Sequence, residues 1–289
     1  MFRFSIVIAV AAFAILLFAS GAWAGNITIP DTIANATWAG YVTGGEDQEV
    51  ETGMQTGQPW DLEAFLFDGS TRTLTMIAGW DFRSGKDGYA SGDVFLATKL
   101  PDYGATIGPL VPPGYPNPII QETFNYSRVL DIDWEAMGAS STANFTVRNL
   151  TQNTSLELAV YGGNGTNVGS NPYRWSPTSP YPDVVGSGTA EYVKYDNNQA
   201  LYNAFGTDVA GITGGIHYSM TFNLTQEGWD QWITAGDLWT HFTYACGNDD
   251  MMGYTEVPVP EPMSMVMLGC LGAGMLGARK ARKLRKAAK

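Results

Sequence analysis

A repeated alternation of apolar and polar side chains constrains the fold of this chain more than any other feature. Residues 217–224 read His-Tyr-Ser-Met-Thr-Phe-Asn-Leu. Successive side chains of a strand point to opposite faces, so this segment has the one apolar face of a half-buried antiparallel strand. Similar segments recur at residues 38–43, 62–67, 71–76, 93–98, 130–135, 145–150, 156–160, 191–195 and 238–244. They predict an all-β fold, an antiparallel, jelly-roll-like β-sandwich over residues 25–256.

Two long stretches rich in proline and glycine interrupt this alternation, at residues 101–118 and 162–188. Their composition predicts irregular loops, and the apolar spacing of a short helix occurs only at residues 226–235. Aromatic side chains in such loops either stack on sugars or fold back over the sandwich. The candidates for sugar stacking are Tyr115, Tyr173, Trp175 and Tyr181.

The N-terminus has the parts of an export signal. Arg3 precedes an apolar run over residues 4–18, and Ala22-Trp23-Ala24 provides the small residues that signal peptidase recognises. An uncleaved anchor is the alternative, although the run is short for a membrane span. We predict a signal peptide over residues 1–24, cleavage by signal peptidase between Ala24 and Gly25, and export of the remaining chain.

The C-terminal residues 257–289 fall into three consecutive parts. Pro260-Glu261-Pro262 is extended backbone that a protease can reach. Residues 263–278 carry no charge and predict a single transmembrane helix, since a cytoplasmic amphipathic helix would need polar residues. The third part is a basic cluster that the positive-inside rule keeps in the cytoplasm, namely Arg279, Lys280, Arg282, Lys283, Arg285 and Lys286.

In the order and spacing of these parts, the tail resembles the PEP-CTERM sorting signal. Proteins with this tail are secreted by Gram-negative bacteria that make exopolysaccharide, and they are substrates of exosortase, a membrane-embedded thiol transpeptidase or protease. The resemblance therefore implies that the chain is tethered to the membrane of the cell envelope and then reaches the cell surface or extracellular matrix. Because the tail occurs on many unrelated domains, it indicates sorting and not the activity of the large domain.

The exported part is strongly acidic. Between Gly25 and Pro260 there are 27 Asp and Glu residues and 8 Lys and Arg residues. A polyanion would be repelled, so nucleic acid is excluded as a partner. Carboxylates also bind calcium, and the candidates in two acidic turns are Asp87, Asp93, Asp249 and Asp250, although neither turn has the spacing of an EF-hand.

Asp131, Asp133 and Glu135 resemble the D-x-D-x-E core of family 18 chitinases, in which the last Glu protonates the glycosidic oxygen. The alternation predicts that these carboxylates share one face of a strand. The chain lacks the alternating strand–helix units of that family, and the residues before the core differ from its pattern. A glycoside hydrolase using Asp133 and Glu135 is therefore the third interpretation.

The leading interpretation is a non-enzymatic structural or interaction protein linked to exopolysaccharide or biofilm, with no cofactor unless calcium binds. A lectin-like carbohydrate-binding module is the alternative. Cys246 is predicted to be buried. Thr71, Thr73 and Thr75 form a row like those of ice-binding proteins, but a binding face needs such rows in register over many strands.

Overall fold

The computed structural model describes residues 24–29, 55–102, 119–160, 170–179, 183–225 and 236–257. The chain divides into two units, residues 1–257 and 258–289, and the second unit lies outside the described residues. The elements in chain order are β1 Ala24–Asn26, β2 Thr28–Ile29, η1 Gln58–Trp60, β3 Leu62–Asp68, β4 Thr73–Ala78, β5 Val94–Ala97, β6 Ile119–Ile120, β7 Arg128–Ile132, α2 Trp134–Met137, β8 Thr142–Asn149, β9 Leu156–Glu157, β10 Arg174–Trp175, β11 Asp183–Tyr195, α3 Asn198–Phe205, η2 Gly206–Val209, β12 His217–Asn223, β13 Gly236–Thr243 and β14 Asp250–Val257.

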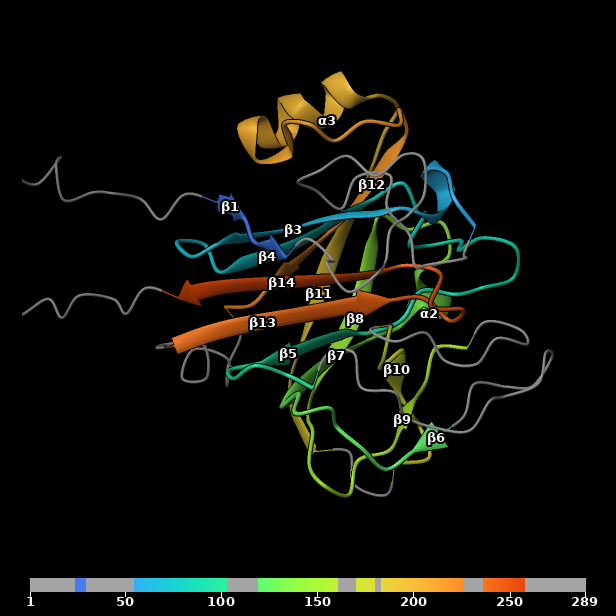
Figure 1. Ribbon diagram of the computed structural model, residues 1–289, viewed down its shortest axis with the longest axis vertical. Coiled ribbons are helices and arrows are strands. Elements are labelled where there is room, and N and C mark those ends of the chain that lie inside the picture. Colours follow the sequence, from blue (N-terminus) through green and yellow to red (C-terminus); the bar gives the residue numbers. More distant parts are fainter. Residues whose placement is uncertain are drawn as a thin grey trace, which may run out of the picture. The chain divides into compact units, whose positions relative to one another are not determined.

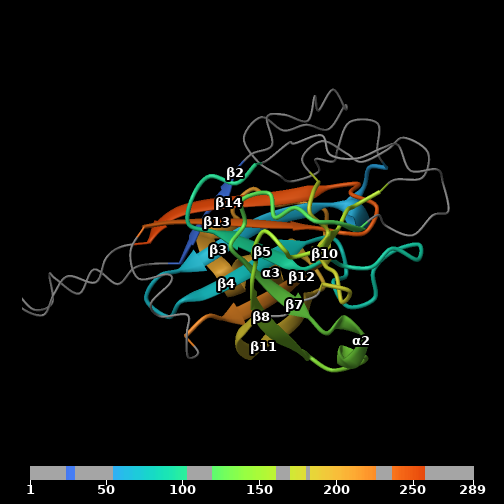
Figure 2. The same cartoon turned by 90° about the horizontal axis from the view of Figure 1, so that it is seen from below.

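Antiparallel strands dominate, as the alternation predicts, and eleven of them hydrogen-bond into one sheet in the order β1-β3-β4-β12-β11-β8-β7-β5-β13-β14-β2 (Figure 1). A sandwich of two separate sheets was expected, whereas this sheet is continuous and curls until β13 and β14 lie across from β8 and β11 (Figure 2). The short strands β10, β9 and β6 form a second, three-stranded sheet.

A short N-terminal segment, residues 24–29, nearly closes the large sheet. Its first half, β1, pairs with β3, and its second half, β2, pairs with β14. Between them, the amide of Ile27 donates to the carbonyl of Phe65 at 2.8 Å, and the carbonyl of Ile27 accepts from the amide of Tyr254 at 2.7 Å. The segment therefore joins the two outermost long strands of the sheet. We call it the closing segment.

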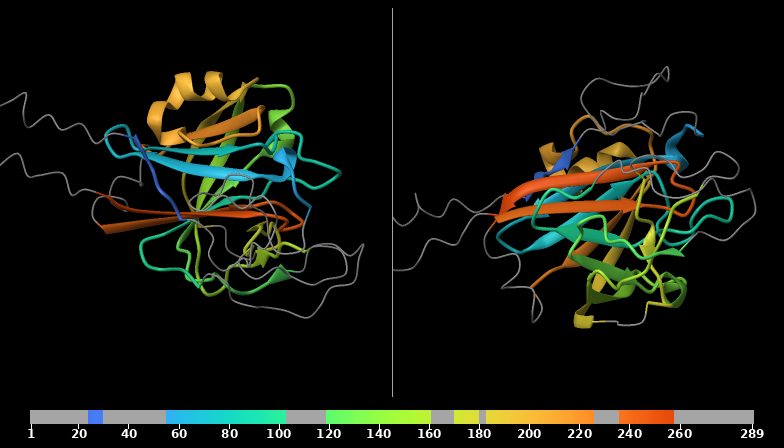
Figure 3. Two further views of the ribbon diagram at one scale, coloured as in Figure 1. Left: turned by 45° about the horizontal axis from the view of Figure 1, so that its top comes forward. Right: turned by 60° about the horizontal axis from the view of Figure 1, so that its bottom comes forward.

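The inner face of the curled sheet holds the main core, and α3 covers part of the outer face. Met220 and Phe222 of β12 point into the core, as their alternation predicts. On the outer face Leu201 of α3 packs with apolar residues of β3 and β4, including Leu66 and Ile77. Figure 3 shows α3 outside the sheet, on the side away from β13 and β14.

Most of the predicted strands are present. The expected strands at residues 62–67, 71–76, 93–98, 145–150, 191–195, 217–224 and 238–244 correspond to β3, β4, β5, β8, β11, β12 and β13. The expected strands at 130–135 and 156–160 are shorter, since β7 ends at Ile132 and β9 at Glu157. Residues 38–43 and the expected helix at 226–235 lie outside the described residues.

One expected loop is wrong, since residues 162–188 contain β10 and the start of β11. Several elements were not expected from the sequence, among them α2, α3 and β14. The first residues of α3 are polar, so apolar periodicity does not mark where the helix begins. It begins at a cap, where the side chain of Asn197 accepts from the amide of Ala200.

In the part of the chain that the structure describes, which excludes residues 258–289, no helix is long and apolar enough to cross a membrane.

Candidate functional site

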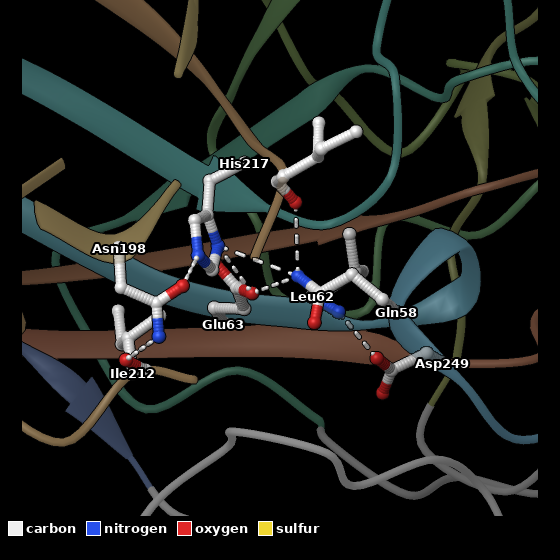
Figure 4. A network of polar contacts seen from close by, with 8 residues as sticks. Gln58, Leu62, Glu63, Asn198, Ile212, His217 and Asp249 are labelled. Carbon is white, nitrogen blue, oxygen red and sulfur yellow. Dashed lines mark hydrogen bonds and ion pairs between the residues drawn. The ribbon is translucent and has the colours of Figure 1, made fainter. Parts of the chain in front are cut away.

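A buried histidine–glutamate pair under α3 is the first candidate for a functional site (Figure 4). His217 Nδ1 lies 2.8 Å from Glu63 Oε1 and 2.9 Å from Oε2, and both side chains are fully buried. The register between β3 and β4 shifts between Leu62 and Ala64, so Glu63 is the extra residue of a β-bulge. Ala64 also packs under α3. The bulge thus places two consecutive residues, one of them charged, on the side that α3 covers.

The other ring nitrogen of His217 connects the pair to α3. Nε2 lies 3.0 Å from Oδ1 of Asn198, the first residue of that helix. The amide nitrogen of the Asn198 side chain donates to the carbonyl of Ile212 at 3.3 Å, which leaves Oδ1 to accept from His217. Nε2 therefore carries a hydrogen. A second proton joins Nδ1 to the Glu63 carboxyl group.

Gln58 completes the network at the end near η1. Its side-chain amide donates to Glu63 Oε1 at 2.6 Å and to the carbonyl of Ile216 at 3.1 Å. A Cβ on Gly214, whose φ is +104°, would overlap Gln58 Oε1. Residue 214 must be glycine both for its backbone conformation and for the room that Gln58 needs.

This network can hold α3 on the sheet, but it has no free group for catalysis. In enzymes a carboxylate–histidine pair orients one ring nitrogen so that the other can take a proton from a nucleophile. Here the two ring nitrogens of His217 are used by Glu63 and Asn198, and the ring is fully buried. The geometry is that of a polar connection between a sheet and a helix.

The second histidine, His241, is also buried. Its Nε2 donates to the carbonyl of Pro172 at 3.1 Å, and burial lowers its pKa from 6.5 to about 3. Its Nδ1 lies 3.9 Å from Oδ2 of Asp250. The ring packs beside Tyr126, with the centroids 5.7 Å apart. A neutral imidazole in this position stabilises the packing between β13 and the segment around Pro172.

The calcium candidate Asp93 instead links strands. Its two carboxylate oxygens accept from the amides of Ile132 at 3.0 Å and Trp175 at 2.8 Å, so it ties β5 to β7 and to the small sheet. Burial, with a smaller contribution from Asp131, raises the pKa of Asp93 well above its usual range. This carboxyl group is a structural acceptor of backbone hydrogen bonds.

The other calcium candidates lie in two places. Asp249 accepts from the amide of Leu62 at 2.6 Å and from the amide of Asp250 at 2.9 Å, and both acids are buried. Asp87 is exposed in a turn, with an ion pair to Lys86 at 3.4 Å. Within the described ranges there is no group of three or more His, Cys, Asp or Glu side chains that could hold a metal ion.

Of the two described candidates for sugar stacking, Tyr173 is buried and Trp175 is partly buried. Tyr173 is 3% exposed, and its hydroxyl donates to the carbonyl of Ser91 at 3.4 Å. Trp175 packs against a core cluster, and the guanidinium of Arg148 lies 3.9 Å from its ring centroid. Stacking on a sugar needs an open ring face, so the role predicted for Tyr173 does not fit its position, while that of Trp175 stays a prediction. Tyr115 and Tyr181 lie outside the described residues.

The three acidic residues of the chitinase-like core do not share a strand face, and that expectation is wrong. Asp131 is in β7 and pairs with Arg148 at 2.7 Å, whereas Asp133 accepts from the amide of Ala136 and caps α2. Glu135 lies in the first turn of that helix and is exposed. The strand ends because a capping Asp precedes a helical turn. These three residues therefore do not form a pair of facing carboxylates.

Cys246 is buried, as predicted, and its sulfur forms no disulfide. Burial raises the pKa of its thiol from 9.0 to about 12. The thiol is therefore protonated and unreactive near neutral pH. Cys246 acts as a small apolar side chain in the core.

Of the predicted signal-cleavage residues, Ala24 and Gly25 lie in β1, opposite Asp68 and Phe67 of β3, while Ala22 lies outside the described residues. The processing residues Pro260, Glu261 and Pro262 also lie outside them. So does the basic cluster at residues 279–286. The last described strand, β14, ends at Val257.

The chain matches no known family model, curated protein or solved structure. The buried network was missed from the sequence, although one signal was present. Glu63 is the only charged residue in the apolar run Leu62–Phe67. A lone carboxylate in such a strand needs a buried partner, and the chain offers only His217 and His241 as histidine partners.

Proposed function

We propose that this chain is an exported bacterial protein with a non-enzymatic structural or interaction role at the cell surface or in the extracellular matrix. Residues 1–24 are its signal peptide, and residues 257–289 are a PEP-CTERM sorting signal with a transmembrane helix over residues 263–278. Exosortase recognises Pro260-Glu261-Pro262. The acidic β-domain between these ends is the cargo.

The position of the two ends of the described sheet supports this proposal. Ala24 and Val257 are each three residues from the hydrogen bond between Tyr254 and Ile27. The start of β1 and the end of β14 accordingly lie on the same side of the sheet (Figure 1). A domain with both ends on one side can be attached to one membrane at both ends without unfolding.

The polar groups of the candidate sites also support a non-enzymatic role. The buried acids Glu63, Asp93 and Asp249 have protein groups as hydrogen-bond partners, and both ring nitrogens of His217 have them too. A catalytic acid, base or nucleophile must instead reach its substrate. The glycoside hydrolase interpretation needs Asp133 as one of two catalytic carboxylates. Asp133 instead caps α2, so the structure adds no support for that interpretation.

The processing of the two ends in an exosortase-positive host tests this proposal. The released wild-type protein should begin at Gly25 on N-terminal sequencing and should lack the tail on mass spectrometry. Replacing Pro260, Glu261 and Pro262 by alanine should leave a full-length, membrane-bound form, and deletion of exosortase should do the same. The matched control is Pro258→Ala, which removes a nearby proline but keeps Pro-Glu-Pro.

Loss of the tail in all of these strains would refute the sorting signal. A protein that still begins at Met1 would instead refute the signal peptide, and it would identify residues 1–24 as an anchor.

A further inference from the structure

Small hydroxyl and amide side chains form an ordered array on the outer face of the large sheet, beside the part that α3 covers. One row crosses four adjacent strands: Thr75 of β4 pairs with Thr221 of β12, Thr221 with Glu191 of β11, and Glu191 with Thr142 of β8. Paired residues in antiparallel strands point to the same face. The neighbouring residues Ala190, Phe222 and Leu74 belong to the inner core, so this row points outward.

Parallel rows extend the array on the same face. Thr73 of β4 pairs with Asn223 of β12. Between β11 and β8, Thr189 pairs with Asn144, and Ser187 pairs with Thr146. Together with the first row these residues form what we call the hydroxyl face. Residues two apart on a strand are about 7 Å apart, and neighbouring strands are about 4.8 Å apart. The isolated threonine row of residues 71–75 is thus the edge of a two-dimensional array.

The outer part of the hydroxyl face is open to solvent. Thr142, Asn144, Ser187, Thr189 and Asn223 are exposed. Each carries a side chain that can both donate and accept hydrogen bonds. Toward β4 the hydroxyl groups are less available to a ligand, since those of Thr75 and Thr221 hydrogen-bond to each other at 2.9 Å.

The hydroxyl face is almost uncharged, in contrast to the exported part of the chain, where 27 acidic residues face 8 basic ones. Glu191 is its single charged member. Two more carboxylates border it, Asp68 opposite Thr73 and Asp131 opposite Thr146, and Asp131 is neutralised by an ion pair with Arg148 at 2.7 Å. A polyanion would be repelled by the acidic domain around this face, and a polycation would find few carboxylates on it. The charge pattern therefore selects a neutral partner that forms many hydrogen bonds.

We propose that the hydroxyl face binds an uncharged, hydroxyl-rich polysaccharide along β8 and β11. One exposed hydrogen bond contributes little against water, but a polymer repeats its hydroxyl groups and can bind at many positions of the array at once. An ice surface is the other repetitive hydroxyl lattice, yet the sheet curls (Figure 2) and Glu191 interrupts the row. This inference rests on the proposed function, since such polymers occur outside cells.

Native affinity electrophoresis of the full chain tests this inference, with hydroxyethyl cellulose and dextran as neutral probes and alginate as an anionic probe. At least one neutral polymer should retard the protein, also at high salt, whereas alginate should not. The triple variant Thr142→Val, Thr146→Val and Thr189→Val keeps the β-branched shape and removes three hydroxyl groups. It should bind about tenfold more weakly. Thr255→Val, on β14 outside the array, is the matched control and should bind as the wild type does.

Three outcomes would overturn the inference: no retardation by either neutral polymer, equal retardation of the triple variant, or stronger retardation by alginate. Inhibition of ice recrystallisation without retardation would assign the face to ice instead. Circular dichroism of the variant shows whether it is folded. The processing of both chain ends in the host is independent of these substitutions, so failure here leaves the proposed export and sorting intact.

Discussion

At the scale of single residues, the most consequential feature is that a hydrogen-bonded pair of ionisable side chains, Glu63 and His217, replaces apolar packing under α3. Taking Glu63 and His217 out of water costs free energy that their mutual attraction and the bonds to Gln58 and Asn198 must offset. A buried pair of this kind does not by itself imply high stability. It ties the start of α3 to the sheet through the bond between His217 and Asn198.

Replacing Glu63 by glutamine should therefore destabilise the protein strongly. The new side chain keeps the shape but turns one oxygen acceptor into a donor facing either Gln58 or His217, so the free energy of unfolding should fall by about 3–5 kcal/mol. Urea denaturation measures this change. The matched control is Glu157→Gln, whose ion pair with the half-exposed Arg174 at 2.7 Å should contribute at most about 1 kcal/mol. Equal effects would show that the buried network is dispensable.

The second histidine predicts a pH dependence. His241 has a folded-state pKa of about 3 and an ordinary value of 6.5. Between these values the unfolded chain binds a proton that the folded chain does not, so this residue lowers stability as the pH falls from 6.5 toward 3. In His241→Gln, which can still donate to Pro172, the loss of stability between about pH 7 and pH 4 should be smaller by about 3 kcal/mol.

Urea denaturation at both pH values provides the measurement. Tyr126→Phe is the control, since it alters the ring packed beside His241 and keeps the titrating imidazole. Its pH dependence should match that of the wild type. If the free energy of unfolding of His241→Gln fell between pH 7 and pH 4 as much as that of the wild type, other groups would govern stability in this range.

At the scale of elements, the alternation in sequence was a good guide to strands and a poor guide to their ends. Residues 217–224 became β12 because a period of two is a local property. The helix α2 interrupts the alternation at Trp134 because Asp133 caps it, and the bulge at Glu63 shifts the register. Caps and bulges depend on single side chains and their partners, so periodicity does not reveal them.

The single curled sheet was not predictable from the alternation either. Its closure depends on the pairing of β1 with β3 and of β2 with β14, which are distant in sequence. The buried network likewise joins residues 154 positions apart, Glu63 and His217. Local patterns predict which face of a strand is buried, but they carry no information about its neighbours in the sheet.

The closing segment yields a prediction at this scale. Ile27→Pro removes the amide that donates to Phe65, so it should destabilise the protein by about 2 kcal/mol more than Ile27→Val, which keeps that amide. It should also expose the edges of β3 and β14 and promote self-association. Urea denaturation and analytical ultracentrifugation measure the two effects. Equal stability and an equal sedimentation coefficient in both variants would mean that the sheet does not need this segment.

At the scale of the whole molecule, the position of the chain ends can be tested by fluorescence energy transfer. Dyes on cysteines introduced at Gly25 and at the exposed Glu256 of β14 should transfer energy more efficiently than dyes at Gly25 and Glu135, because β1 begins near the end of β14 and α2 lies at the other side of the sheet (Figure 1). Cys246 is buried and should remain unlabelled. Cys270 is replaced by serine in both proteins. A reversed order of efficiencies would contradict the arrangement of the ends.

The pairing of Ala24 with Asp68 also means that folding and signal cleavage compete in time. The bond expected to be cut by signal peptidase, between Ala24 and Gly25, is part of a strand in the finished sheet, and a protease needs its substrate extended and unpaired in its own cleft. If cleavage comes first, the sheet closes around a free end. If closure comes first, the same hydrogen bonds that complete the sheet shield the bond, and the molecule keeps its leader for as long as it stays folded.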